Sequence, residues 1–271
     1  MTSGRVINWP RCLLWLCSTV VIGYLLVPLL IVVPISFSSG AYLQFPPPGY
    51  SLQWYRSYFQ DPQWVDATWL SVEIALAAAA LAVILGGLAA VALVRMAIPF
   101  KAAIRIILLL PMIIPSIVVA ISVYSLYARL HLVATFVGIV LAHTILALPF
   151  AATMLMSGFQ QLNRSLEEAS FTMGGSTWYT LRRVTLPALK PSIAAAAVFS
   201  FMTSWDEVIM VIFIGGGDAT TLPLKMFSYL RTEINPTIAA VSTLLLAAVG
   251  IGFAMIEFLR PRLSRARSSA G

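Results

Sequence analysis

The sequence predicts an all-α membrane protein that crosses the bilayer with six transmembrane helices. Of its 271 residues, 60% are hydrophobic and only 10% are charged, whereas an average soluble domain has about 25% charged residues. The mean hydropathy of +0.92 points the same way. Because a spanning helix needs roughly 20 mostly apolar residues, a chain of this length has room for about six spans and their loops. This composition excludes an ordinary soluble domain and an intrinsically disordered chain.

Six apolar windows define the predicted spans. They cover residues 13–35, 69–94, 104–127, 132–156, 189–213 and 237–259. The first window is longer than the 7 to 15 residues of a typical signal-peptide core, so we expect it to remain as a membrane anchor. No long-period repeat and no appended soluble domain is visible in the sequence. We therefore expect a single transmembrane domain over residues 1–271.

The distribution of basic residues predicts that both termini are cytoplasmic. Lysine and arginine resist translocation and accumulate in the cytoplasmic segments of membrane proteins. With both termini inside, only Arg56, Arg129, Lys225 and Arg231 of the 17 basic residues lie outside. The net charge of +7 is spread over short segments beside the membrane. An anionic inner leaflet explains it more simply than a nucleic-acid partner does.

Small residues and prolines mark two of the windows. The second window carries small residues at strict four-residue spacing, which lets another helix approach closely. They are Ala78, Ala82, Gly86 and Ala90. In the third window, Pro111 and Pro115 interrupt the helical hydrogen bonds, and the resulting kink is either part of a pathway or purely structural.

Two outer segments follow from the window boundaries. Residues 36–68 look like an interfacial aromatic segment, and residues 214–236 look like a flexible entry to a short re-entrant or surface helix.

The largest predicted cytoplasmic segment, residues 157–190, does not resemble a passive linker. Apolar side chains recur there at helical spacing around Glu167 and Glu168. They are Leu162, Leu166, Ala169 and Met173. This pattern predicts an amphipathic helix that Gly174-Gly175 ends.

A second short helix is expected directly after this turn. Ser176 is placed to cap it, and its side chains include Trp178, Tyr179 and Leu181. Leu186-Pro187 is then expected to stop the helix and return the chain to the membrane. A short helix-turn-helix with exposed acidic and apolar groups predicts a docking element for a cytoplasmic partner. The alternative is a generic amphipathic helix on the membrane surface.

The same segment contains a specific spacing. Glu168-Ala169-Ser170 is followed after three residues by Gly174, and after nine more by Val184-Thr185-Leu186-Pro187. This resembles the E-A-A, G, I-x-L-P loop of the inner-membrane permease subunits of binding-protein-dependent ABC importers. Ser170 and Val184 depart from the pattern, and both changes are conservative in volume. The resemblance also covers the six-span arrangement and the position of the loop before the last two spans.

The resemblance implies a coupling helix that sits in a groove of a cytoplasmic ATPase, with Glu168 facing the ATPase and Gly174 providing the turn. It assigns the coupling role to Glu168, Ala169, Gly174, Leu186 and Pro187. It further implies three partners, namely an ATPase dimer that binds ATP and Mg²⁺, a second permease subunit and an external solute-binding protein. The sequence has no G-x-x-x-x-G-K-[ST] run, so we expect no phosphate-binding loop, no cofactor and no enzymatic activity in this chain.

Acidic residues within the windows call for a partner or a wet cavity, because a charge at mid-bilayer costs roughly 2.5 to 3.5 kcal/mol. Glu73 and Glu257 lie near window ends and are expected to reach interfacial water. Asp206 and Glu207 are expected deeper in the fifth window, beside Trp205. We expect one of them to line the translocation path, where an organic cation gains charge pairing and cation–π attraction, and the other to bond a neighbouring helix. The alternative is an acid that pairs with a base of a partner subunit.

The substrate is expected from a narrower resemblance. The stretch from Trp205-Asp206-Glu207-Val208 through Gly215-Gly216-Gly217 to residues 221–228 is similar to the spermidine/putrescine-type permeases of this family, as is the Pro-rich outer segment that ends in Trp54-Tyr55. The resemblance implies import of a polyamine across a bacterial inner membrane. Another small organic solute, such as an aminophosphonate or an amino-acid-like compound, is the alternative.

A rival class is a proton-coupled secondary transporter in which Asp206, Glu207 or His143 carries protons. Otherwise we expect His143 to be packed or hydrogen-bonded, because His131 and His143 alone make no metal set. An intramembrane enzyme is disfavoured because no nucleophile has a local catalytic signature.

Overall fold

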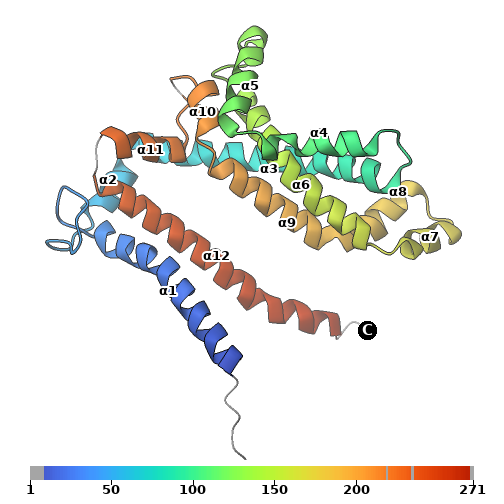
Figure 1. Ribbon diagram of the computed structural model, residues 1–271, viewed down its shortest axis with the longest axis horizontal. Coiled ribbons are helices and arrows are strands. Elements are labelled where there is room, and N and C mark those ends of the chain that lie inside the picture. Colours follow the sequence, from blue (N-terminus) through green and yellow to red (C-terminus); the bar gives the residue numbers. More distant parts are fainter. Residues whose placement is uncertain (1–8, 218, 233–234, 269–271) are drawn as a thin grey trace, which may run out of the picture. The chain divides into compact units, whose positions relative to one another are not determined.

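The computed structural model describes residues 9–217, 219–232 and 235–268, and all regular elements in these ranges are helices (Figure 1). The side chains of residues 9–12, 253 and 256–268 are outside the described part, and the expectation for Glu257 falls there. The chain divides into two compact units. One contains residues 1–62 and 228–271, and the other contains residues 63–227. The predicted all-α class is confirmed.

The first unit consists mainly of α1 (Trp9–Ser36), α2 (Gln53–Gln60) and α12 (Thr237–Ser268), and both α1 and α2 contact α12. The segment between α1 and α2 folds back on the end of α1. The Ser36 and Tyr55 hydroxyls lie 2.7 Å apart, and the Trp54 indole N–H donates to the Ser38 carbonyl at 2.8 Å. Part of the predicted aromatic segment is therefore ordered by its own hydrogen bonds.

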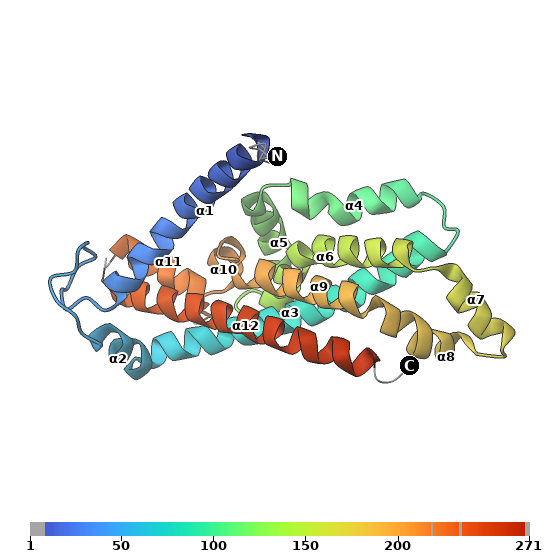
Figure 2. The ribbon, with the colours of Figure 1, turned by 90° about the horizontal axis from the view of Figure 1, so that it is seen from below.

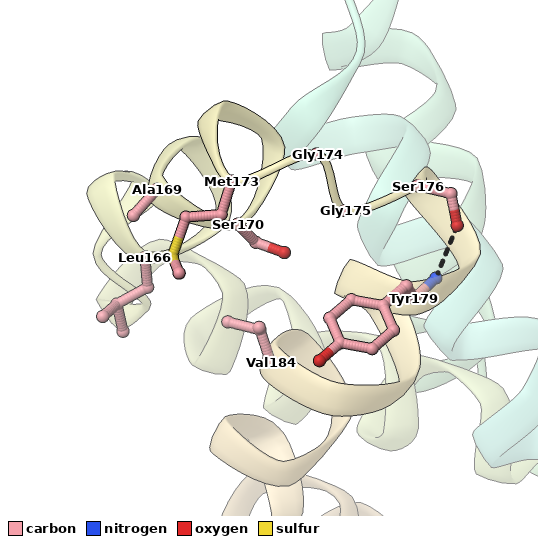
Figure 3. A pocket seen from close by; sticks show the side chains of 9 residues that line it. All are labelled: Leu166, Ala169, Ser170, Met173, Gly174, Gly175, Ser176, Tyr179 and Val184. Carbon is pink, nitrogen blue, oxygen red and sulfur yellow. Dashed lines mark hydrogen bonds between the residues drawn. The ribbon is translucent and has the colours of Figure 1, made fainter.

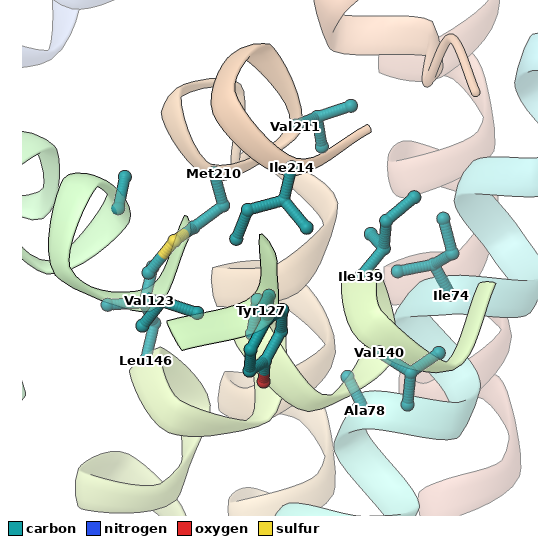
Figure 4. Close-up of a cluster of buried hydrophobic side chains, with 12 residues drawn as sticks. Ile74, Ala78, Val123, Tyr127, Ile139, Val140, Leu146, Met210, Val211 and Ile214 are labelled. Carbon is teal, nitrogen blue, oxygen red and sulfur yellow. The ribbon is translucent and has the colours of Figure 1, made fainter. Parts of the chain in front are cut away.

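The second unit is built around α6, which runs beside α9 (Figure 2). Its helices are α3 (Pro62–Arg95), α4 (Lys101–Ile113), α5 (Ser116–Leu130), α6 (Phe136–Gln161), α7 (Arg164–Thr172), α8 (Thr177–Thr180), the π-helix η1 (Leu181–Thr185), α9 (Leu186–Trp205), α10 (Ile209–Ile214) and most of α11 (Leu222–Thr232). A cluster of buried side chains from α3, α5, α6 and α10 packs together at one end of this unit (Figure 4). It includes Ile74, Tyr127, Ile139, Met210 and Ile214.

Small residues allow α3 to lie against α6, as the four-residue spacing predicts. The small residues of the ridge on α3 are all buried. A Cβ atom added to Gly86 would lie only 2.8 Å from the backbone nitrogen of Ala152. On the other side of α6, a Cβ at Gly158 would lie 2.6 Å from the Cβ of Ser192 on α9. The two contacts fix α6 between its neighbours at a separation that larger side chains would not permit.

Two predicted spans are not single straight helices. The third window forms α4 and α5, which are bent by 106° at the break between Ile113 and Ser116. Pro111 stays inside α4, and the bend falls at Pro115, whose ring fixes the backbone directly before α5. The fifth window likewise ends as a helix at Trp205 and resumes as α10. The interruption that Pro111 and Pro115 predict in the window 104–127 is therefore present, and the α4–α5 pair can still form one broken span. In the window 189–213 the helix ends at Trp205, so the prediction that Asp206 and Glu207 lie inside a continuous helix is wrong.

The expected stop at Leu186-Pro187 is wrong as well. Helical structure is unbroken from Thr177 to Trp205. The missing N–H of Pro187 falls directly after the π-helix η1, where the helical hydrogen-bond pattern changes. The π-helix before it has the wider i→i+5 pattern and absorbs one extra residue. The second short helix thus runs straight into the long helix that follows it.

Among the described residues, four helices are long and apolar enough to cross a membrane, and the bent α4–α5 pair adds a fifth if it forms one span. The four are α1, α3, α6 and the continuous helix that ends with α9. A shorter apolar stretch, Thr237–Gly252, begins α12. The chain is a multi-pass membrane protein.

The glycine contact between α3 and α6 predicts an asymmetry between two adjacent residues. Gly86→Ala forces the helices apart and is expected to cost about 1–3 kcal/mol, the usual range for overpacking. Gly87→Ala is the matched control, because its Cβ would only touch the Leu155 side chain at an ordinary 3.8 Å. Thermal unfolding of the detergent-solubilised protein, followed by size-exclusion chromatography, should show a lower midpoint only for the Gly86 variant. Equal midpoints would contradict the close approach.

Candidate functional site

The candidate site is the hairpin of α7 and α8 that joins α6 to α9, and its local structure follows the sequence closely. The Asn163 side chain caps α7 by accepting from the Ser165 N–H at 3.0 Å. Gly174 ends α7 with a φ of +83°, a left-handed conformation that glycine adopts without strain. The Ser176 hydroxyl then caps α8 by accepting from the Tyr179 N–H at 3.2 Å. The two short helices, the turn and the serine cap are all confirmed.

The hairpin encloses an open hollow of about 690 Å³ (Figure 3). Four of its lining residues are Ala169, Ser170, Gly174 and Val184, and all four are positions of the E-A-A, G, I-x-L-P pattern. These four residues, which the pattern spaces along the sequence, therefore lie on one surface of the folded hairpin. Leu186 and Pro187 are exposed at the start of α9 and do not line the hollow. Glu168 is exposed on α7 outside its lining.

Large apolar side chains around the hollow are exposed. Met173 is 89% exposed, Trp178 67% and Tyr179 54%. Phe171 is exposed as well. An apolar rim of this kind on a hairpin that also carries charged side chains is typical of a protein-binding surface.

The hairpin is tied to the rest of the second unit by polar contacts that the sequence reasoning missed. The Arg95 guanidinium, at the end of α3, forms an ion pair with Glu167, with 3.0 Å between Nη2 and Oε2. The other carboxylate oxygen of Glu167 accepts from the Thr185 hydroxyl at 2.8 Å. One sequence feature could have predicted this ion pair: Arg95 directly follows a predicted span, on the same predicted side of the membrane as the loop that contains the adjacent acids Glu167 and Glu168.

The second candidate region is the break between α9 and α10, where Asp206 and Glu207 lie. Asp206 caps the end of α9 with its backbone N–H, which donates to the Met202 carbonyl at 3.0 Å, and its carboxylate is exposed. Glu207 turns back on the chain, and its carboxylate accepts from the Met210 N–H at 2.9 Å, in the first turn of α10. The two acids therefore sit at a helix break and have different surroundings.

Trp205 precedes this break and stacks on Phe201, one turn earlier on α9, with ring centroids 5.7 Å apart and an interplanar angle of 19°. His143 lies on α6, and its Nδ1 is 2.8 Å from the hydroxyl of Ser204, one residue before Trp205, in a buried contact. The predicted packed and hydrogen-bonded histidine is confirmed. Within the described ranges no group of three His, Cys, Asp or Glu residues is placed to hold a metal ion.

Comparison with known proteins identifies the family. The family described as the binding-protein-dependent transport system inner membrane component matches residues 82–265. The chain belongs to this family. Members of it are transport components, so the helix-turn-helix and the broken helix are parts of a permease.

Two relatives illustrate how far the similarity extends. The spermidine/putrescine transport system permease protein PotC of Haemophilus influenzae is 33% identical over 228 residues, which are 84% of this permease and 88% of the relative. The putrescine transport system permease protein PotI of Escherichia coli is 32% identical over an alignment of 263 residues that covers 93% of each chain. The similarity therefore includes the hairpin, the helix break and most of both units.

Solved structures show the same fold at low identity. A chain of a bacterial ABC transporter involved in the import of the acidic polysaccharide alginate matches with a TM-score of 0.69 at 14% identity, covering 94% of this permease and 96% of that chain. A chain of the MetNI methionine ABC transporter matches with a TM-score of 0.57 at 22% identity, covering 74% of this permease and 94% of that chain.

The left-handed turn at Gly174 predicts a graded effect of substitution. No atom lies within 4 Å of an added Cβ, so the cost of Gly174→Ala is backbone strain, about 1–2 kcal/mol. Gly174→Asn should be milder, because asparagine tolerates this conformation. Trypsin cleavage after Arg182 and Arg183 in the detergent-solubilised protein measures opening of the hairpin. We expect the alanine variant to be cleaved fastest; equal rates for alanine, asparagine and glycine would be inconsistent with a strained turn.

Proposed function

We propose that this chain is one permease subunit of an ABC importer, and that it carries a polyamine such as spermidine or putrescine across the bacterial inner membrane. The energy comes from ATP that a separate subunit hydrolyses. The single observation that supports this proposal most is that four residues of the loop pattern, Ala169, Ser170, Gly174 and Val184, line one exposed hollow on the α7–α8 hairpin. The family membership of the chain supports it independently.

In this proposal the hairpin is the coupling helix. The hairpin sits in a groove of the ATPase, its exposed apolar side chains contact the walls of that groove, and the exposed carboxylate of Glu168 faces that subunit. Ala169 and Gly174 form part of the contact surface, whereas Leu186 and Pro187 act from the start of α9. Binding of ATP and Mg²⁺ is assigned to the ATPase.

The whole chain is proposed to form one membrane domain of six spans with both termini in the cytoplasm. The bent α4–α5 pair then makes one broken span, and α12 makes the sixth. Support comes from the family match, which runs from α3 into α12 and so includes residues of both units. The excess of basic residues in the segments assigned to the cytoplasm supports the orientation.

Three kinds of partner complete the importer: a cytoplasmic ATPase dimer, a second permease subunit and an external solute-binding protein. Closure of the ATPases would draw the coupling helices together and rock the spans from an inward-facing to an outward-facing state. Substrate released by the binding protein would then pass between the two permease subunits.

A polyamine fits the helix break because several negative features meet there. The C-terminal end of α9 presents carbonyl groups without helical partners and the negative end of the helix dipole. The exposed carboxylate of Asp206 lies at the same point. Broken membrane helices often place such ends at substrate and ion sites. The names of the two relatives point to the same class of substrate.

We further propose that the two acids have different tasks. Glu207 is engaged with the Met210 N–H and stabilises the start of α10. Asp206 is the acid that meets the cation, with Trp205 close to it in the chain. An aminophosphonate or amino-acid-like solute would carry its own anionic group and would be repelled by this arrangement.

Reversal of charge on the hairpin is expected to separate docking from folding. Glu168→Lys should abolish uptake and lose the co-purifying ATPase, while the protein remains inserted in the membrane. Glu168→Gln should keep part of both, because it removes the charge without reversing it. Uptake by cells and pull-down of the ATPase measure the two effects. Wild-type uptake in the lysine variant would rule out this docking surface.

The different roles proposed for Asp206 and Glu207 can be tested by substituting each acid separately. Asp206→Asn should raise the KM for polyamine uptake about tenfold, in line with the loss of one partly desolvated charge contact. Glu207→Gln should leave it nearly unchanged, since the amide oxygen still accepts from the Met210 N–H. Initial rates in vesicles over a range of putrescine concentrations test this, and the reverse order would assign the substrate contact to Glu207.

Reconstitution distinguishes the importer from the proton-coupled alternative. The importer requires the ATPase, the solute-binding protein and ATP for accumulation. Accumulation by this chain alone under a proton gradient would favour the secondary transporter and would identify His143, Asp206 or Glu207 as the group to test next.

A further inference from the structure

The polar contacts between α3, α7 and η1 have a role beyond the contact surface for the ATPase. We propose that Arg95, Glu167 and Thr185 form a positioning network that holds the coupling helix on the ends of α3 and α9, and that this network sets how much transport each hydrolysed ATP yields. The inference rests on the proposed function of the hairpin. None of the three residues belongs to the contact surface assigned above.

The network is built around a single carboxylate. Glu167 uses one oxygen for the ion pair with Arg95, at 3.0 Å, and the other to accept from the Thr185 hydroxyl, at 2.8 Å. The two side chains of the ion pair are only 15% and 19% exposed. A pair shielded in this way is screened less by salt than a surface pair. Its geometry therefore restrains the helix more than a typical exposed contact.

The three residues belong to three different elements. Arg95 is the last residue of α3, Glu167 lies in the first turn of α7, and Thr185 is the last residue of η1, directly before α9. The Arg95 guanidinium also lies over the ring of Phe159 on α6, 5.8 Å from its centroid. One cluster thus joins the coupling helix to three of the long helices.

Helix α7 has no buried side chain, so apolar packing contributes little to its position. We infer that the contacts of Glu167 with Arg95 and Thr185 help to hold α7 in position instead. The neighbouring Glu168 is exposed, because adjacent residues of a helix point about 100° apart. The two adjacent acids thus have separate tasks: Glu168 is free for the ATPase, and Glu167 connects the helix to the spans.

Loosening this network should leave the ATPase bound but weaken the transmission of its movement. The test uses the complete importer, that is this chain with its second permease, ATPase and solute-binding protein, reconstituted in proteoliposomes. Putrescine uptake and ATP hydrolysis are measured together, and their ratio is the readout. A residue with only a structural role would change the amount of complex and not this ratio.

Arg95→Gln, Glu167→Gln and Thr185→Val are each expected to retain the ATPase and to lower uptake per ATP, by about fivefold for the two charge variants, the lower end of typical coupling between sites. Arg105→Gln is the matched control, because Arg105 is an exposed arginine of α4 and should leave the ratio unchanged. The exchange Arg95→Glu with Glu167→Arg should restore most of the ratio that either reversal alone removes.

The inference is overturned if Arg95→Gln and Glu167→Gln keep the wild-type ratio, if they lose the ATPase from the complex, or if the charge exchange fails to restore coupling. Failure of the proposed function would give a different result in the same assay: the wild-type importer would accumulate putrescine without hydrolysing ATP. ATP-dependent uptake by the wild type together with unchanged ratios in the variants would reject the network alone.

Discussion

Two glycines determine how closely α6 approaches the helices on either side of it. Gly86 of α3 leaves room for the backbone of α6 at Ala152, and Gly158 of α6 leaves room for Ser192 of α9. The hairpin begins where α6 ends and returns into the helix that contains α9, so the spacing of these two helices sets the distance between its ends. The buried contact between His143 and Ser204 fixes the same two helices near the other end of the pair. Both candidate sites therefore depend on backbone proximity that a larger side chain would prevent.

Short-range sequence signals were sufficient to predict the turn and the helix cap of the hairpin. The glycine at position 174 and the serine at position 176 each specify a conformation within a few residues, and the structure contains the turn and the cap where they were predicted. The ridge of small residues on α3 was equally readable, because four-residue spacing places such residues on one helix face. The family could be recognised from the same short stretch, since its spacing reflects residues that surround one hollow.

Apolar windows did not predict the helix boundaries where the backbone changes direction within a stretch of equally apolar residues. The residues around Pro115 are as apolar as the rest of their window, so hydropathy alone gives no sign of the 106° bend, and only the two prolines predicted a kink there. Asp206 and Glu207 were placed inside a helix because the apolar residues resume after them. The contact between Arg95 and Glu167 joins residues far apart in the sequence, and only the folded chain brings them together.

Helical structure continues for 29 residues from Thr177 to Trp205, and at a rise of 1.5 Å per residue this is a rod about 43 Å long. One end of the rod carries the rim of the hollow, and the other end stops at the two acids. This helix connects the two sites directly, and the π-helix η1 together with Pro187 and Pro191 provides the points at which it can bend. In the proposed importer, the surface that contacts the ATPase and the acid that contacts the substrate therefore lie at opposite ends of one continuous helix, so a movement at one site can reach the other through a single element.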